Sequence, residues 1–481
     1  MPATPAEPTA SPAPAGRIRV AVVGGGIAGL VAARELALGG AQVTLLESRD
    51  RLGGRLRRET VAGIALDVGA EAFAVRGGGV AQLLDELGLA ADIVRPAALG
   101  SWLVSADRAA PAPVSGHLGI PVHPFDRRTV RALGLVGALR AAVDPLLPRG
   151  VGADADTLAG LVRARLGRRV LDRLVTPVAR GVHSAGPEQL PVGPDLARAL
   201  AEHGSLLAAG RALRAVAAPA GAAVEGLRRG MGDLVEALER ELRAHGVDIR
   251  TGLPVTSVTR DEADSAAWRV GADGTAEVFD AVLFASLDAY EAASAAASGA
   301  AATGARTIVE VAVLVVRDAR LDAAPRGTGA LVSLPPTAEG VTRAKALTHV
   351  SAKWPHRFRD TPPGTHVLRL SYGELRDGSS ALALADRAFF DHALADASRI
   401  LGLELGPQQL DGALRARWES PAPVRGGSGA DHGLPRGWAL AGDWVSGTGL
   451  ASVIPGARDA ARSLLEADLR TAAAHTEAST A

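Results

Sequence analysis

Cysteine is absent from this 481-residue chain. Its absence excludes disulfides, thiolate catalysis, iron–sulfur clusters and cysteine-ligated metals. The 11 histidines are scattered, and no two of them have the H-x-x-x-H spacing that puts a pair on one helix face, so we expect no metal site. Any redox chemistry would therefore need a bound organic cofactor.

An excess of one charge and long apolar runs are also missing. The 52 basic and 52 acidic residues give a formal net charge of zero, and no basic stripe stands out, so nucleic acid is not an expected partner. No apolar run approaches the roughly 18 residues that span a bilayer. Residues 1–16 and 467–481 are expected to be disordered tails, and the first of them lacks the charged and apolar regions of a signal peptide. We expect a cytoplasmic protein, and peripheral contact with the inner face of the membrane stays open.

A glycine turn near the N-terminus is the strongest signal that is present. The apolar run Arg19 to Val23 predicts a buried parallel strand. Gly24, Gly26 and Gly29 follow at G-x-G-x-x-G spacing, which allows a tight turn, close approach to a pyrophosphate and packing of the next helix on the strand. Glu47 then ends a second strand, Gln42 to Leu46, where an acid can accept hydrogen bonds from ribose hydroxyls. Together these parts predict a bound dinucleotide.

The residues after Glu47 favour FAD over NAD, because they resemble a motif of known FAD proteins. Arg51 to Arg55, RLGGR, resembles the second glycine motif of the glutathione-reductase-type FAD proteins, such as the amine oxidases and phytoene desaturases. The likeness continues at Asp67 to Ala72, DVGAEA, which passes beside the flavin ring in those families. Trp438 to Trp444, WALAGDW, resembles the strand and turn that contact the ribityl–phosphate chain and the pyrimidine edge. Val255 would meet the adenine.

The resemblance thus implies a set of FAD-binding residues. They are Gly24, Gly25, Gly26, Ile27, Ala28, Gly29, Glu47, Ser48, Gly53, Gly54, Arg55, Gly69, Ala70, Glu71, Ala72, Val255, Gly442, Asp443, Ser452, Val453 and Ile454.

The expected fold class is α/β: a Rossmann-like FAD-binding domain of the glutathione-reductase type, a mixed-sheet substrate domain and a helical subdomain. The FAD-binding domain would be discontinuous, because its motifs are separated in the chain. The sequence also predicts a buried strand at Ala281 to Ala285. The mixed sheet is predicted to begin with the alternating, β-branched run Thr307 to Val316 and to continue through Ala330 to Val332, Ala346 to Ser351 and His366 to Tyr372. Residues 78–89 predict an amphipathic helix, followed by irregular proline-rich chain to about residue 124. The expected bounds are 17–75, 225–288 and 412–466 for the FAD-binding domain, 76–124 and 289–411 for the substrate domain, and 125–224 for the helical subdomain.

Three further segments resemble a narrower family, the oxygen-dependent coproporphyrinogen III and protoporphyrinogen IX oxidases, with features of actinobacterial members. They are LDRLVTPVARGVHSAGPEQL at Leu171 to Leu190, APAGAAVEGLRRG at Ala218 to Gly230 and AKALTHVSAKWPH at Ala344 to His356. The resemblance implies six-electron oxidation of coproporphyrinogen III to coproporphyrin III in haem biosynthesis. The acceptor would be O2, H2O2 would be released, and the product would pass to the next enzyme of the pathway. Protoporphyrinogen IX stays open as the substrate.

This chain also departs from the family pattern near its C-terminus. Many members carry an aromatic residue and a G-I-P run near the C-terminal flavin contact, whereas this chain has GLASVIP at Gly449 to Pro455. Asp443 resembles the amine-oxidase form. This departure leaves open which residues contact the flavin. It does not change the expected cofactor.

The catalytic residues are open, and no catalytic triad is expected, because aromatisation supplies much of the driving force. Lys353 is the one candidate: on a strand predicted near the flavin, it could hold a water at flavin N5 or meet a substrate carboxylate. The alternative is a surface lysine whose stem lies along apolar surface. Glu71 could contact substrate or flavin, or be a solvated acid. Arg180 and His183 could line the pocket or be structural.

The sequence leaves two alternative functions open. Another FAD amine oxidase or carotenoid desaturase would share every glycine motif, although an aromatic content of 3% does not favour the aromatic pair typical of amine oxidases. A non-catalytic relative of the prenyl-binding escort and GDP-dissociation-inhibitor proteins is the second alternative. The presence of both Glu47 and Arg55 argues against it.

Overall fold

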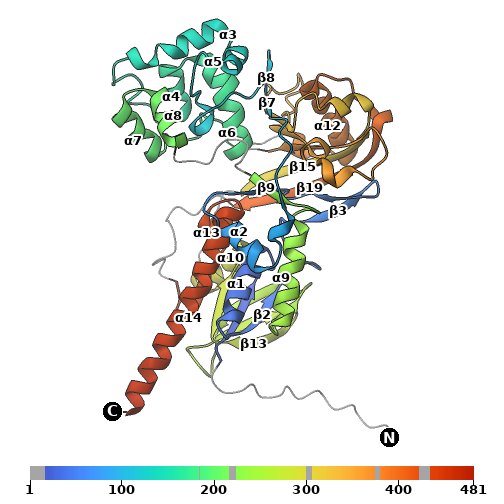
Figure 1. Ribbon diagram of the computed structural model, residues 1–481. Coiled ribbons are helices and arrows are strands. Elements are labelled where there is room, and N and C mark those ends of the chain that lie inside the picture. The colour runs from blue at the N-terminus through green and yellow to red at the C-terminus, as the bar shows by residue number, and fades with distance from the viewer. Residues whose placement is uncertain are drawn as a thin grey trace.

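A computed structural model describes residues 17–183, 185–215, 224–298, 306–373, 380–421 and 434–480. Three parts can be followed in Figure 1: a layered α/β part at the lower end, a mixed sheet with α12 at the upper right, and a bundle of helices at the upper left. The first two parts are each assembled from segments far apart in the sequence.

The lower part is built on a five-stranded parallel sheet with the order β10-β2-β1-β14-β20. Alternate residues of β1 face opposite sides. Val20 and Val22 pack with helices α1, α9 and α14, whereas Ala21 and Val23 pack against a three-stranded antiparallel sheet. The result is the Rossmann-like architecture that the sequence predicts. Its elements are β1 (Arg19–Val23), α1 (Ile27–Leu38), β2 (Gln42–Leu46), α9 (Gly232–Ala244), β10 (Asp248–Arg250), β11 (Val255–Arg260), β12 (Trp268–Ala272), β13 (Thr275–Phe279), β14 (Ala281–Phe284), α10 (Leu287–Ser298), β20 (Trp438–Leu440), α13 (Asp443–Ser446) and α14 (Leu450–Thr480).

A seven-stranded mixed sheet forms the second part, with the order β19-β15-β18-β17-β16-β7-β8. All its neighbours are antiparallel except β16 and β7, which run parallel. Ala312 and Leu314 of β15 face α12, and Val311 and Val313 face the β3–β4 hairpin. The elements are β3 (Arg58–Val61), β4 (Ile64–Asp67), β7 (Trp102–Ser105), β8 (Ala109–Pro111), β15 (Arg306–Arg317), β16 (Gly329–Ser333), β17 (Ala346–His349), α11 (Val350–Lys353), β18 (Thr365–Tyr372), α12 (Asp386–Leu401) and β19 (Leu410–Pro421).

The third part is helical, as its alanine, leucine and arginine content predicts. Leu133, Leu161 and Leu174 lie in its core. Arg165 and Asp144 form a fully buried ion pair at 2.7 Å inside it. Its helices are α3 (Arg127–Ala142), α4 (Leu158–Arg165), α5 (Arg168–Val170), a π-helical turn η4 (Leu171–Val175), α6 (Thr176–His183), α7 (Pro194–His203) and α8 (Leu206–Ala215).

Shorter elements connect these parts. They are β5 (Phe73–Ala74), α2 (Gly79–Glu86), η1 (Ala90–Asp92), β6 (Ile93–Val94), η2 (His117–Gly119), η3 (Asp144–Leu146), β9 (Val224–Leu227), η5 (Ala319–Ala323), η6 (Pro355–Phe358), η7 (Ser380–Ala383) and η8 (Pro407–Gln409).

Four sequence expectations are wrong in detail. The stretch expected as irregular chain before residue 124 contains β6, β7 and β8, and β7 pairs with β16, more than two hundred residues away. β19 belongs to the seven-stranded sheet, so the C-terminal piece of the FAD-binding part does not begin at residue 412. Helix α14 continues to Thr480 through the expected tail 467–481, where alanines favour a helix. Lys353 ends the helical turn α11 and is not on a strand, because Pro355 cannot donate to a ladder.

Some expectations fall on parts of the chain that the structure does not describe. These are the N-terminal tail 1–16, the first part of the segment from Ala218 to Gly230, and the side chain of His183.

Candidate functional site

A cavity of about 850 Å³ lies where the carboxyl ends of β1, β2, β14 and β20 meet β19 of the mixed sheet. Ligands of open parallel sheets bind at such strand ends, beside the point where the strand order reverses. Here the order reverses between β1 and β14. The volume lies in the range of cofactor sites.

The two glycine motifs meet at this cavity. Gly53 donates its N–H to the Gly25 carbonyl at 2.8 Å and pairs with Gly26 in an isolated parallel bridge. A Cβ on Gly29 would lie 1.8 Å from the Gly24 oxygen, so glycine lets α1 pack closely on the turn after β1. A Cβ on Gly26 would meet nothing within 4 Å. The first turn of α1 therefore faces open space that suits a phosphate.

Glu47 is held at the carboxyl end of β2 by backbone donors. Its Oε2 accepts from the Gly25 N–H at 2.6 Å, and its Oε1 accepts from the Arg49 N–H at 2.8 Å. The side chain is buried yet lines the cavity. These contacts fix an acid where a ribose would lie in this fold.

Arg55 joins three separate segments at the cavity wall. Its guanidinium pairs with Asp443 at 2.8 Å and donates to the Glu419 carbonyl at 3.4 Å. The neighbouring Trp444 also lines the cavity, and its buried indole N–H has no acceptor among the described residues. Arg55 therefore links the second glycine motif to β19 and α13 at the cavity wall.

Most residues predicted at FAD line this cavity. They are Gly24, Gly26, Ile27, Ala28, Glu47, Ser48, Gly53, Gly54, Arg55, Ala70, Val255, Gly442, Asp443 and Val453. The other predicted residues do not line the cavity: Gly25 and Gly29 in the glycine turn, Gly69, Glu71 and Ala72 around Ala70, and Ser452 and Ile454 around Val453. Ser452 accepts a hydrogen bond from Arg76, and Ile454 is fully buried in the core.

Sequence reasoning missed two groups of lining residues. One follows β14 and comprises Ala285, Ser286, Leu287, Asp288 and Ala289, and the other comprises Arg417, Trp418 and Glu419 on β19. The first could have been found, since β14 was predicted and the ends of parallel strands meet at one edge. The second had no local signal, because β19 reaches the cavity only through its pairing with β15.

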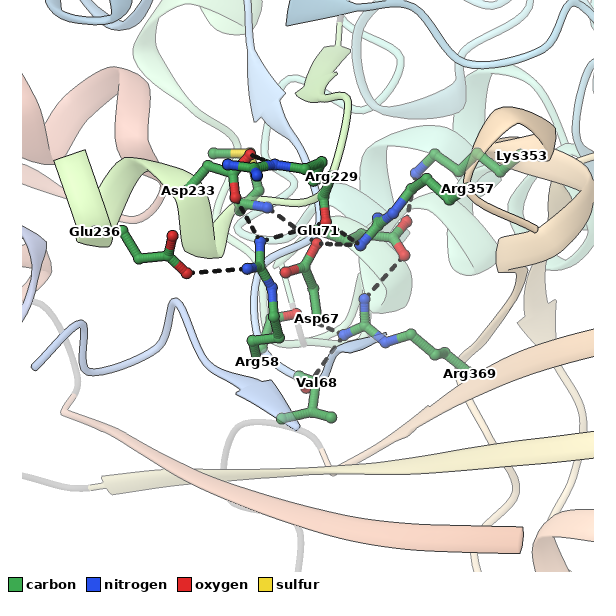
Figure 2. Close-up of polar contacts among 12 residues, drawn as sticks. Arg58, Asp67, Val68, Glu71, Arg229, Asp233, Glu236, Lys353, Arg357 and Arg369 are labelled. Atoms are coloured by element: carbon green, nitrogen blue, oxygen red, sulfur yellow. Dashed lines mark hydrogen bonds and ion pairs between the residues drawn. The ribbon is translucent and has the colours of Figure 1, made fainter. Parts of the chain in front are cut away.

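Glu71 anchors a charged cluster beside Ala70 (Figure 2). Its carboxylate accepts from the Lys353 ammonium at 2.6 Å and from the Arg369 guanidinium at 2.9 Å. Burial by itself would raise the pKa of Glu71, but the cations of Lys353 and Arg369 outweigh burial and lower that pKa from 4.5 to about 2. Glu71 is therefore an ionised, paired acid and not a solvated one.

Lys353 is not the surface lysine of the alternative interpretation. Its side chain is 16% exposed and is paired with Glu71. Arg180, in α6, is half-buried and does not line the cavity. Within the described ranges, no group of three or more histidines and acids could hold a metal, and no helix is long and apolar enough to cross a bilayer.

Comparison with known proteins gives concordant results. Residues 27–464 match the family model described as flavin containing amine oxidoreductase. A curated Mycobacterium tuberculosis protein named coproporphyrinogen III oxidase is 32% identical, with 93% of this chain and 97% of that protein covered. A Propionibacterium freudenreichii protein of the same name is 27% identical, with 96% and 93% covered. The crystal structure of a putative protoporphyrinogen oxidase from Exiguobacterium has a TM-score of 0.76 at 23% identity, covering 93% of this chain and 98% of that one.

Proposed function

The chain belongs to the flavin containing amine oxidoreductase family, and on that premise we propose that it is a coproporphyrinogen III oxidase of haem biosynthesis. It is an oxidoreductase and its cofactor is FAD. The proposed reaction removes six hydrogens from coproporphyrinogen III and gives coproporphyrin III, with O2 as the acceptor and H2O2 as the by-product. The coproporphyrin would then pass to the next enzyme of the pathway.

One observation carries the choice of substrate: the likeness to curated coproporphyrinogen III oxidases extends over almost the full length of both chains. It includes the helical part and the mixed sheet, where a substrate-specific wall would lie, and not only the glycine motifs common to FAD proteins. Similarity confined to those motifs would support the cofactor alone.

The residues at the cavity fit FAD in three places. The open first turn of α1 at Gly26 would hold the pyrophosphate, and Glu47 would accept hydrogen bonds from the adenosine ribose. Arg55 and Asp443 would meet the ribityl–phosphate chain. Bound FAD supplies a two-electron acceptor, so the six-electron oxidation needs three rounds.

The charged cluster beside Ala70 favours an anionic substrate. Lys353 and Arg369 carry two positive charges against the single negative charge of Glu71, so the cluster is net positive. Lys353 uses one N–H on Glu71 and could give another to a water or to a propionate of the porphyrinogen. A cationic amine would be repelled there, which favours a porphyrinogen over an amine.

Peripheral contact with a membrane has its best support in α3. Figure 1 places this helix at the outer edge of the helical part. After a kink at Gly134, it exposes an apolar face that η3 extends: Leu135, Val136, Leu139, Val143 and Leu146. α3 itself contains no acid, and its basic residues are Arg127, Arg128, Arg131 and Arg140. An apolar face with basic neighbours suits the surface of a bilayer with anionic lipids.

The proposal is tested by aerobic incubation of the FAD-loaded protein with coproporphyrinogen III and, separately, with protoporphyrinogen IX. Porphyrin fluorescence and peroxide are followed together. We expect faster fluorescence growth with coproporphyrinogen III. A preference for protoporphyrinogen IX would show that protoporphyrinogen IX is the substrate. Porphyrin formation no faster than spontaneous oxidation would overturn the proposal and favour amines or polyenes as substrates.

A further inference from the structure

Two oppositely charged segments pair in antiparallel order next to the start of α9. Asp67 and Glu71 lie four residues apart on the chain leaving β4. Lys353 and Arg357 lie four residues apart on α11 and η6. Lys353 pairs with Glu71 at 2.6 Å, and Arg357 pairs with Asp67 at 3.0 Å. Figure 2 shows both contacts side by side.

The Asp67–Arg357 pair is the more buried of the two. The side chains of Asp67 and Arg357 are 2% and 7% exposed, against 10% and 16% for Glu71 and Lys353. A buried ion pair of this kind holds its partners in one geometry, because separating the charges would leave each uncompensated. Arg357 can therefore fix the residues that flank it.

The partner of Arg357 is itself fixed. Asp67 also accepts the backbone N–H of Met231, the residue before α9, at 3.0 Å. Gly230 packs against the pair so closely that a Cβ there would lie 2.5 Å from the Arg357 guanidinium and 2.6 Å from the Asp67 carboxylate. On the other side, Arg369 donates to the carbonyl of Gly69 at 2.6 Å. The chain from Asp67 to Glu71 is thus held at both ends.

We propose that Arg357 is a positioning residue, which through Asp67 sets the register of α11 and η6 against the cavity wall and so keeps the Lys353 ammonium on Glu71. The effect of Arg357 on turnover rests on the role proposed above for Lys353. The effect of Arg357 on the position of the Lys353 ammonium does not depend on that role. With Arg357 removed, α11 and η6 lose their second buried charge contact with the 67–71 segment, and Lys353 leaves Glu71 more readily.

The chain is well suited to a direct test, because it has only two lysines, Lys345 and Lys353. The FAD-loaded protein is treated with an amine-acylating ester, and the modification of each lysine is followed by peptide mass spectrometry. Lys345 is the internal control: it is 3% exposed, and its ammonium donates to the Gly373 carbonyl at 2.7 Å. Any general loosening of the fold would also raise the rate at which Lys345 is acylated.

Arg357→Met should make Lys353 react roughly tenfold faster while Lys345 is unchanged, since one charge-assisted contact supporting the pair is lost. Arg357→Lys, which retains the charge, should recover part of the protection. Arg58→Met is the matched control, because Arg58 belongs to the same network but pairs with Asp233 and Glu236. In Arg58→Met, both lysines should be acylated at their wild-type rates.

An unchanged Lys353 rate in folded Arg357→Met would overturn the proposal, as would an equal rise at both lysines or the same rise in Arg58→Met. Turnover gives a second readout. Arg357→Met should lower kcat in the wild-type background and have no further effect in Lys353→Met, whereas an independent structural role would lower kcat in both. If the wild type oxidises no porphyrinogen, the proposed function fails while the labelling result still decides the positioning role.

Discussion

Glu47 and Glu71 are both buried acids beside the cavity, but they have different partners. Glu47 accepts backbone N–H groups and keeps a face on the cavity. Glu71 accepts hydrogen bonds from two cationic side chains and does not line the cavity. The sequence predicted Glu47 at the cofactor from its place after the glycine turn, and Glu71 from the family resemblance of Asp67 to Ala72, and both contacts remain predictions. It could not distinguish their environments, because Lys353 and Arg369 are about three hundred residues away in the chain.

Glu47→Gln should weaken FAD binding by roughly ten- to a hundredfold, since a charge-assisted hydrogen bond contributes about 1.5–3 kcal/mol. The substitution keeps the size of the side chain but removes the anion that the Gly25 N–H and a ribose hydroxyl would share. FAD titration of the deflavinated protein, followed by flavin fluorescence, measures the change. Glu262→Gln, at an exposed acid away from the cavity, should bind FAD as the wild type does, and equal affinity of the two variants would contradict the role of Glu47.

The lowered pKa of Glu71 predicts a pH-dependent contribution to stability. Because its pKa falls from 4.5 to about 2 on folding, the contribution is complete above pH 4.5 and is lost as pH falls toward 2. The shift corresponds to roughly 3 kcal/mol. Thermal unfolding should therefore separate the wild type from Glu71→Gln at pH 6, and the two Tm values should approach each other at pH 3. A Tm gap that is constant over this range would show that ionisation of Glu71 contributes nothing.

Among elements, those with local determinants could be predicted and those that depend on distant pairing could not. The bounds of β1 and β2 agree with the sequence because each is an apolar run next to a glycine turn or an acid. β7 was missed because it is short and its partner β16 lies far along the chain. The helical turn at Lys353 was missed because the prediction placed Lys353 on a strand continuing from Ala346 to Ser351, whereas β17 ends at His349.

Gly29→Ala should abolish FAD retention, because the added Cβ would lie 1.8 Å from the Gly24 oxygen and α1 would have to move off β1. The ratio of flavin to protein absorbance after purification measures the loss. The comparison is Gly150→Ala, where the added Cβ meets nothing within 4 Å, and it should retain a wild-type flavin content. Normal flavin content in Gly29→Ala would mean that α1 need not pack so closely.

Helix α3 offers a test of the membrane contact. Leu139→Glu places a charge in its apolar face and should strongly reduce co-sedimentation with vesicles containing anionic lipid, because burial of that face and attraction to the arginines act together. Leu38→Glu, a similar change at an exposed leucine of α1, should not alter sedimentation. Equal binding by both variants, or no binding by the wild type, would contradict a membrane-facing α3.

At the scale of the whole molecule, the class of fold and the cofactor could be predicted, because the first glycine turn with β1 and α1 and the second glycine motif are local signals. The assignment of individual cofactor contacts remains a prediction. The contact of each lining residue depends on where each part of FAD lies in the cavity. The mixed sheet is the least predictable region, since β3, β4, β7, β8 and β19 come together there from both ends of the chain.

The proposed function is tested most directly by reconstitution of the deflavinated protein with increasing FAD while coproporphyrin fluorescence is followed under air. We expect coproporphyrinogen III to be oxidised in proportion to the FAD bound, up to one FAD per chain, and Glu47→Gln to need more FAD to reach the same rate. A rate that never exceeds spontaneous oxidation, or that does not depend on FAD, would contradict it.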